Sequence, residues 1–230
     1  SVAFIVAAAS GVVALLVATL ISDAKTRIPD SAIAVQDERQ EEGTAPLISK
    51  AAIFPTLVFL TYAFAMAPVS VFLYSLASDS GLPENFNIGF YFTVMSGMTM
   101  LTTLISGRIA DRLGRGSVIV PGLLLVGLAM LILWQVSSVG LFLGAAFLHG
   151  VGYGLIYPGI NSLVIDRVPA RERGSALATL QQAWDVGASG GNFILGPVVG
   201  VYGVASAFLI VGIGALTGAA GYVIGSRKKL

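Results

Sequence analysis

The sequence has no cysteine and a single histidine, and these two scarcities exclude several kinds of chemistry. Without cysteine there is no disulfide, no thiolate metal ligand and no cysteine nucleophile. One histidine cannot make a histidine-rich metal site, and neither an H-E-x-x-H pattern nor a phosphate loop occurs. We therefore expect a protein that is not an enzyme, is not driven by ATP and holds no cofactor.

Charged residues are also scarce, at 11% of 230 residues, whereas average soluble proteins contain about 25%. Hydrophobic residues make up 56% of the chain, more than a soluble core of this length can bury. Lipid is the solvent that accommodates such a chain, and 28 glycines suit closely packed membrane helices. The net charge of +1 gives no basic footprint for nucleic acid. The lipid bilayer is the predicted partner, and nucleic acid is not.

Seven apolar runs predict seven transmembrane helices, because a helix needs about 20 apolar residues to cross the hydrocarbon. The runs are 2–21, 52–77, 87–107, 117–137, 140–165, 174–199 and 203–225. Residues 22–50 form the one long polar stretch, which we expect to be a flexible linker. The predicted fold class is all-α, a polytopic membrane protein.

The basic residues predict the orientation, because positive charge stays in the cytoplasm. All 13 of them follow spans one, three, five and seven, at Lys25, Arg27, Arg39, Lys50, Arg108, Arg112, Arg115, Arg167, Arg171, Arg173, Arg227, Lys228 and Lys229. We expect a multi-pass protein of the cell (inner) membrane, with 22–50 and the C-terminus cytoplasmic and Ser1 on the other side. One span more or fewer would put basic groups on both sides.

The loop after the third span reads Gly107-Arg-Ile-Ala-Asp111-Arg112-Leu-Gly114-Arg115-Gly116. It resembles the cytoplasmic-loop signature of the major facilitator superfamily, G-x-x-x-D-R-x-G-R-R/K. Five defining positions match, and the final basic position is replaced by Gly116. The loop lies between the second and third of the six helices after the linker, which is where the family has its second copy of the signature.

This resemblance implies a domain organisation. Residues 1–21 would be the last helix of a missing N-terminal bundle, and 22–50 the cytoplasmic linker between bundles. Residues 51–225 would form a six-helix C-terminal bundle of two inverted three-helix repeats, and 226–230 a cytoplasmic tail. Cargo would pass between the two bundles at mid-membrane as they rock. The missing bundle and a small-molecule substrate are then the expected partners.

The resemblance also implies that the loop motif latches one conformation of the transport cycle. Gly107 would let two helices approach closely, and Asp111 would accept from the N–H groups of a neighbouring helix N-terminus. Arg112 and Arg115 would pair with carboxylates at another helix end. The candidate carboxylates are Asp166 and Glu172. The alternative is that these charges only follow the positive-inside rule.

Two ionisable residues lie inside the predicted spans, where such residues mark proton or substrate paths. Asp185, if buried, would exchange a proton near neutral pH or neutralise a cationic substrate. Its alternatives are a structural carboxyl, hydrogen-bonded to a neighbouring helix, or a carboxyl in contact with water. His149 has an unperturbed pKa of about 6.5 and permits a proton role, although a lone histidine is more often a packing residue.

Polar neighbours at helical spacing extend this candidate proton or substrate site. Gln181 lies four residues before Asp185 on one helical face, and Ala188 and Asn192 would continue that face. Further residues of the spans either join a cargo cavity or pack: Asn161, Tyr62, Tyr91, Trp184, Phe64 and Phe92.

The fifth and sixth spans are rich in glycine. The run from Gly150 to Gly159 resembles the fourth bundle helix of drug-exporting members. The sixth span contains Gly187, Gly191, Gly196, Pro197 and Gly200. It resembles a degenerate copy of the family's antiporter signature, G-x(8)-G-x(3)-G-P-x(2)-G, which belongs to the first half. Taken alone, these residues indicate close helix packing and a bend.

The resemblance implies secondary active transport of a small organic solute by alternating access. Proton-coupled efflux, as in bacterial drug or metabolite antiporters, is the favoured form, with the proton as coupling ion. The alternatives are an uptake permease of the same superfamily, a membrane receptor or channel without transport, and a paired half-transporter. We expect this chain alone not to transport.

Overall fold

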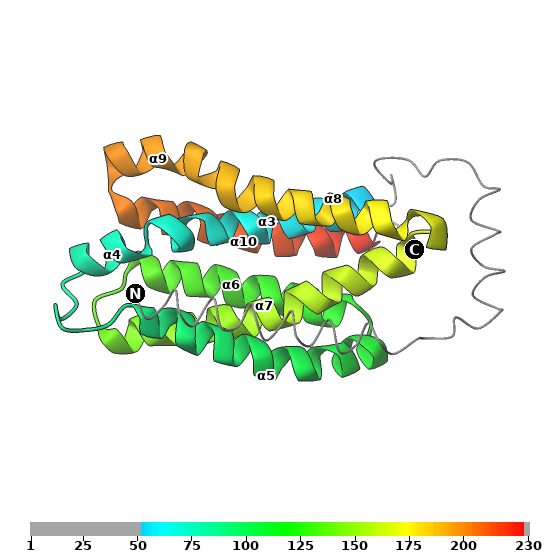
Figure 1. The fold of residues 1–230 in the computed structure, drawn as a ribbon, viewed down its shortest axis with the longest axis horizontal. Coiled ribbons are helices and arrows are strands. Elements are labelled where there is room, and N and C mark those ends of the chain that lie inside the picture. Colours follow the sequence, from blue (N-terminus) through cyan, green and yellow to red (C-terminus); the bar gives the residue numbers. More distant parts are fainter. Residues whose placement is uncertain (1–51, 228–230) are drawn as a thin grey trace, which may run out of the picture. The chain divides into compact units, whose positions relative to one another are not determined.

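The structure is a computed structural model that describes residues 52–227. The elements in order are α3 (Ile53–Val71), α4 (Leu73–Asp79), α5 (Gly89–Leu113), α6 (Gly116–Trp134), α7 (Val139–Arg167), a 3₁₀ helix (Ala170–Glu172), α8 (Arg173–Asp185), a π-helical turn (Val186–Gly190), α9 (Gly191–Tyr202) and α10 (Val204–Arg227). Figure 1 shows these helices side by side, and no strand occurs within the described range. The all-α prediction is confirmed for this part of the chain.

Four of these helices are long and apolar enough to cross a membrane: α3, α6, α7 and α10. The predicted spans 87–107 and 174–199 coincide with α5 and with the continuous run from α8 to α9, which are helical but more polar. The predicted span 2–21 and the linker 22–50 lie outside the described residues. The described part is therefore an array of helices typical of a polytopic membrane protein.

Three of the long spans contain an internal proline: Pro68 in α3, Pro121 in α6 and Pro158 in α7. Pro68 ends the regular part of α3, but Phe72 N–H still bonds to the Pro68 carbonyl at 2.8 Å, so α4 continues the same run. Pro158 lies inside α7, where its missing N–H leaves the Gly154 carbonyl without its helical donor. Each proline marks a place where its helix can bend.

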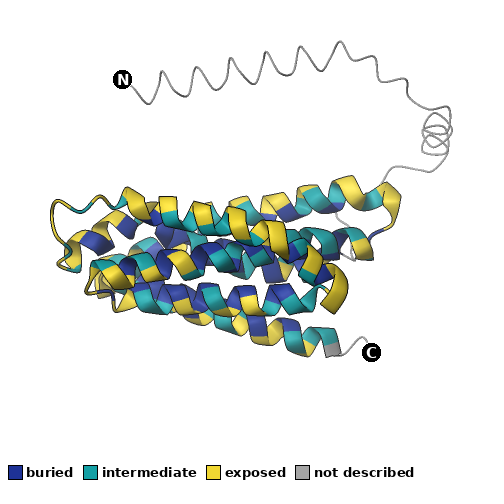
Figure 2. Ribbon diagram, turned by 90° about the horizontal axis from the view of Figure 1, so that it is seen from below, coloured by how far each residue is buried: buried dark blue, intermediate teal, exposed yellow. Residues whose placement is uncertain are grey.

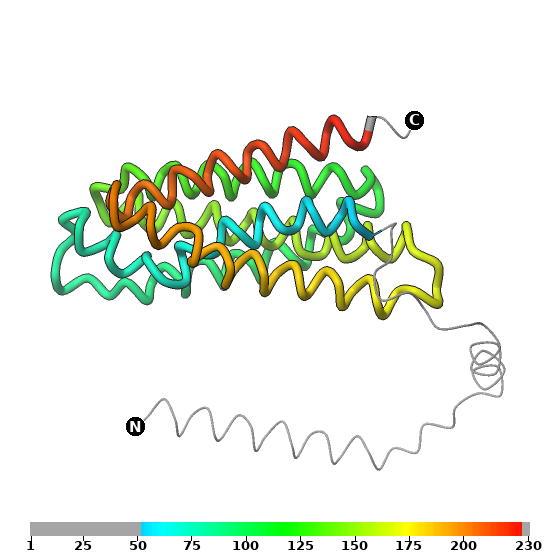
Figure 3. The backbone as a smooth tube through the Cα atoms, turned by 90° about the horizontal axis from the view of Figure 1, so that it is seen from above, coloured from blue at the N-terminus to red at the C-terminus, as the bar shows by residue number. Residues whose placement is uncertain are grey.

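The contacts between helices follow a two-fold pattern. If α3–α4, α5 and α6 form one triple, the second triple is α7, α8–α9 and α10. The first helix of each triple packs against the second and third helices of the other: α7 against α5 and α6, and α3 against α8–α9 and α10. The two third helices, α6 and α10, pack against each other (Figures 1 and 3). Two inverted repeats produce this pattern, because the triples begin at opposite ends of the bundle.

Small residues bring α7 into direct contact with both of its main neighbours. A side chain at Gly150 would collide with the Met95 carbonyl of α5, and one at Gly152 would lie 2.7 Å from the Gly122 carbonyl of α6. Successive glycines therefore face different helices and allow backbone to approach backbone. This explains why the glycine-rich run lies in the centre of the bundle.

Figure 2 shows exposed residues along the outer faces of the helices, and many of the exposed residues are large and apolar. Examples from three helices are Leu101, Leu104, Leu128, Phe193 and Ile194, all of which are exposed. Such surfaces are unfavourable in water but match hydrocarbon chains. The burial pattern therefore agrees with lipid as the surrounding solvent.

Candidate functional site

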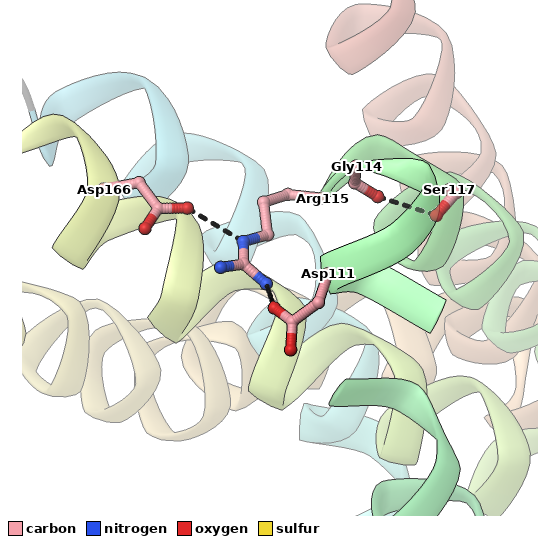
Figure 4. Close-up of polar contacts among 5 residues, drawn as sticks. All are labelled: Asp111, Gly114, Arg115, Ser117 and Asp166. Carbon is pink, nitrogen blue, oxygen red and sulfur yellow. Dashed lines mark hydrogen bonds and ion pairs between the residues drawn. The ribbon is translucent and has the colours of Figure 1, made fainter. Parts of the chain in front are cut away.

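The loop motif folds into a tight turn between α5 and α6. Gly114 has φ +88° and ψ 159°, a backbone conformation that is open only to glycine. The Ser117 hydroxyl donates to the Gly114 carbonyl at 2.6 Å and closes the turn. This geometry directs Arg115, the residue just before α6, back toward the end of α5 (Figure 4).

Arg115 joins two carboxylates that come from different helices (Figure 4). Its Nη1 donates to Asp111 Oδ1 of α5 at 2.6 Å, and its Nε donates to Asp166 Oδ2 in the last turn of α7 at 2.8 Å. The hydrogen bonds that Arg115 donates to Asp166 and Asp111 raise its pKa, so the guanidinium stays charged at every physiological pH. We call Asp111, Arg115 and Asp166 the charge cluster.

A second contact fixes the same end of α7. The guanidinium carbon of Arg167 lies 5.2 Å from the ring centroid of Phe54, at the start of α3. Such a cation over an aromatic face is attractive. The last turn of α7 is therefore tied to the α5–α6 turn through Asp166 and to α3 through Arg167.

The other contacts predicted for the latch are not made among the described residues. Asp111 accepts from Arg115 and, within residues 52–227, from no helix N-terminus. Arg112 is exposed and has no ion pair in the described part, while Glu172 lies 3.9 Å from Arg171 and away from the motif. The predicted close approach at Gly107 is wrong for this bundle, because a Cβ there would meet no atom within 4 Å.

An aromatic cluster joins α3, α7 and α8 at mid-bundle. The Tyr62 and Tyr153 rings stack with centroids 5.1 Å apart, and Trp184 lies 5.6 Å from Tyr62 and 6.0 Å from Tyr153. Phe59 stacks on Trp184 at 5.8 Å, and Tyr157 lies 5.6 Å from Tyr153. Tyr157 remains 42% exposed. The cluster thus runs from a buried centre to a face that is open in the described part.

Tyr62 and Trp184 were predicted from the sequence as candidate cargo residues, whereas Tyr153 and Tyr157 were not. The signal was present in the four-residue spacing of α7, since positions 149, 153, 157 and 161 are polar or aromatic. Asn161 continues this line, and its amide donates to the Tyr157 carbonyl at 2.7 Å. Phe64, by contrast, packs beside Gly191 in the helix interface.

His149 is completely buried between two tyrosines. Its Nδ1 lies 2.9 Å from the Tyr91 hydroxyl, and its ring is edge-on to that of Tyr62 at 6.2 Å. The Tyr62 hydroxyl and His149 Nε2 are buried and have no hydrogen-bond partner among the described residues. We call Tyr62, Tyr91 and His149 the buried triad.

Asp185 and Gln181 are both exposed, and Asp185 has no hydrogen bond or ion pair with the described residues. The π turn begins directly after Asp185 and adds a residue to the helical repeat. An added residue rotates everything that follows by about 100°. Asn192 therefore does not continue this face, which corrects our prediction; its Nδ2 donates to Ala188 and its Oδ1 is buried.

The glycines of the α8–α9 run divide into two groups. A Cβ at Gly187 would lie 2.5 Å from that of Ala63, and one at Gly191 would lie 2.7 Å from that of Ala67, so both contact α3. Gly196 meets no atom within 4 Å, so its predicted packing role is wrong for the described bundle. Pro197 lies inside α9 without ending it.

A cavity of about 630 Å³ lies at the opposite end of the bundle from the charge cluster. The α3–α4 run, the following loop and the start of α5 form its walls. Aromatic rings and one carboxylate line it, with Tyr74, Glu84, Phe86, Ile88 and Phe92 among the lining residues. Of the predicted cargo residues, Phe92 lies in this cavity.

Together, the fold and the cluster define a helical membrane protein whose helix ends are joined by a charged turn. The sequence profile of the Major Facilitator Superfamily matches residues 57–229, so the chain belongs to this superfamily. The predicted family and fold class are therefore confirmed. Members are transporters and not enzymes, which also confirms the non-enzymatic prediction.

Three curated relatives illustrate the range. An uncharacterized MFS-type transporter of Salmonella typhimurium is 29% identical over 58% of this chain and 34% of its own length. Multidrug resistance protein 2 of Bacillus subtilis is 30% identical, over 49% of this chain and 27% of its own. A 4-hydroxybenzoate transporter of Pseudomonas putida is 31% identical, over 47% and 24%. The chain thus matches about a third or less of the length of these relatives.

Proposed function

We propose that this chain is part of a secondary transporter that exports a small organic solute by alternating access, in exchange for protons. The charge cluster carries the proposal, because Arg115 joins carboxylates of two helices at one bundle end. Exposed ion pairs contribute only about 0.2–1 kcal/mol each. Such contacts can favour one arrangement of helix ends and still break in every cycle. The solute would pass between this bundle and an N-terminal one.

The distribution of charge supports a cytoplasmic position for the charge cluster. Every arginine between residues 52 and 227 lies near this end of the bundle, and the loop at the cavity end carries Asp79 and Glu84 but no basic residue. Positive charge is retained in the cytoplasm. We infer that the protein spans the bacterial inner membrane with the cavity on the extracytoplasmic side.

Charge also favours a neutral or cationic solute. Asp185 is the one charged residue in the described helices that lies more than two turns from an end of its helical run. It follows Trp184 of the aromatic cluster, whose open face offers rings for stacking. An aromatic carboxylate would meet no cation from the described residues at this cluster. This supports efflux of drug-like compounds over uptake of aromatic acids.

The proposal is tested with ethidium, a planar aromatic cation, in vesicles that contain the full-length transporter. We expect saturable ethidium movement that is driven by a pH gradient and reduced by Arg115→Gln. Flux that rises linearly with concentration and ignores the gradient would instead indicate a channel. Vesicles that contain only these 230 residues should show no coupled flux.

A further inference from the structure

The buried triad crosses the bundle in the direction from the cavity to the aromatic cluster. Tyr91 follows Ile88 and precedes Phe92, both of which line the cavity, and its ring lies 5.7 Å from that of Phe92. At the other end, Tyr62 stacks on Tyr153 of the aromatic cluster at 5.1 Å. His149 lies between the two tyrosines, 2.9 Å from the Tyr91 hydroxyl. The Tyr91 ring thus borders a side chain of the cavity wall and the Tyr62 ring borders the aromatic cluster, with His149 between them.

Two atoms of the triad point to an additional polar group. The Tyr62 hydroxyl and His149 Nε2 are both fully buried and unpartnered among the described residues. A buried polar site of this kind is one that an ordered water molecule fills, because it offers several hydrogen-bond partners. One water between the two atoms would complete a hydrogen-bonded chain from Tyr91 to Tyr62.

No other ionisable group contacts His149 in the described part. From α3 it meets Tyr62, and from α5 it meets Tyr91. α6 contains no ionisable residue, and on α8 the one carboxylate, Asp185, is exposed. On α7 itself the next ionisable side chain is Tyr153, one turn away. Among the described residues, the two tyrosines are therefore the ionisable neighbours through which a proton can reach the imidazole.

We propose that Tyr91, His149 and Tyr62 conduct protons between the extracytoplasmic cavity and the aromatic cluster. A hydronium ion that enters from the cavity past Phe92 gives a proton to the Tyr91 oxygen while Tyr91 gives its own proton to His149 Nδ1. The imidazolium then releases its Nε2 proton through the bridging water to the Tyr62 oxygen, and Tyr62 passes its own hydroxyl proton to water on the open side of the aromatic cluster. Each oxygen regains the proton it gave, and the imidazole must reorient to restore its first tautomer. This inference rests on the proposed proton coupling.

A spectroscopic test uses the fact that His149 is the single histidine. The chain is labelled with ¹⁵N-histidine in lipid nanodiscs, so every imidazole ¹⁵N signal belongs to His149. As the pH falls from about 8 to below about 4, the signals should move from neutral imidazole to imidazolium. Tyr91→Phe should change the tautomer ratio at the higher pH, whereas Tyr153→Phe should match the wild type. If the imidazole signals never shift with pH, or if Tyr91→Phe leaves the tautomer ratio unchanged, the relay proposal is wrong.

A transport test separates the relay from the proposed function. In vesicles with the full-length protein, ethidium exchange at equal pH needs no net proton movement, whereas uphill movement does. His149→Gln should retain exchange and lower gradient-driven movement by at least about 100-fold. If the wild type shows no proton-driven movement, the proposed function fails. If the wild type and His149→Gln are driven equally, only the relay fails.

Discussion

Gly114 and Gly203 hold the same backbone conformation in corresponding turns of the two triples. Their φ angles are +88° and +83°, and their ψ angles are 159° and 165°. In each turn a serine three residues later donates its hydroxyl to the glycine carbonyl at 2.6 Å, Ser117 in one and Ser206 in the other. The turns lie at opposite ends of the bundle. Only the first carries the charge cluster, so the repeat preserves the turn while the charges differ.

Gly114 and Gly107 belong to the same motif but should respond differently to alanine. Gly114→Ala forces a side chain into a glycine-only conformation and should lower the free energy of unfolding by about 1–3 kcal/mol. Gly107→Ala places its methyl in open space within a helix and should leave stability unchanged or slightly higher. Thermal unfolding in one detergent compares the two. Equal losses for both would show that Gly107 also packs tightly.

Arg115 and Asp166 should show an energetic coupling that neither shows with Arg112. We expect a double-mutant cycle of Arg115→Gln and Asp166→Asn to give about 0.2–1 kcal/mol, because the pair is partly exposed to solvent. Arg115→Lys should recover little of this coupling energy, since a lysine ammonium lacks the planar set of N–H donors with which a guanidinium bonds two carboxylates. Arg112→Gln is the matched control and should not alter stability. A coupling of zero for Arg115 with Asp166 would contradict a latch.

Gly187 and Gly196 provide a second matched pair within one helical run. Gly187→Ala would bring a methyl within 2.5 Å of the Ala63 side chain, so α3 and α8 must separate. We expect a loss of about 1–3 kcal/mol from this overpacking. Gly196→Ala meets open space and should be neutral. If chemical unfolding of the two variants gave the same midpoint, α3 would not be in contact with this run.

Tyr157 should contribute to ethidium binding through its exposed ring. In a Trp134→Phe background the chain has one tryptophan, Trp184, whose fluorescence reports binding at the aromatic cluster. Tyr157→Ala should weaken the apparent affinity by about 0.5–1.5 kcal/mol, the contribution of one aromatic pair. Tyr202→Ala removes a more exposed tyrosine at the end of α9, outside the aromatic cluster, and serves as the control. Loss of quenching in both variants would argue for nonspecific partition into lipid.

Apolar run length and charge were enough to predict where the helices lie and that Arg115 and Asp166 share one end of the bundle. The details that failed depend on neighbours or on local backbone geometry. The π turn after Asp185 moves Asn192 to another face of the helix. The prediction assumed a regular α-helical repeat, because nothing in the local sequence indicates a π turn. Whether a glycine such as Gly107 packs depends on which helix passes it, which local sequence does not specify.

The proline within α7 gives this helix a mechanical role. His149, Tyr153 and Tyr157 all precede Pro158, whereas Asp166 follows it. The helix therefore has two segments with a bend point between them: His149 and the two α7 tyrosines of the aromatic cluster lie on the N-terminal segment, and Asp166 of the charge cluster lies on the C-terminal one. In the proposed transport cycle, loss of the Asp166–Arg115 and Arg167–Phe54 contacts would let the short segment move while the long segment stays packed between α5 and α6. Movement at the charge-cluster end would then leave His149 in place.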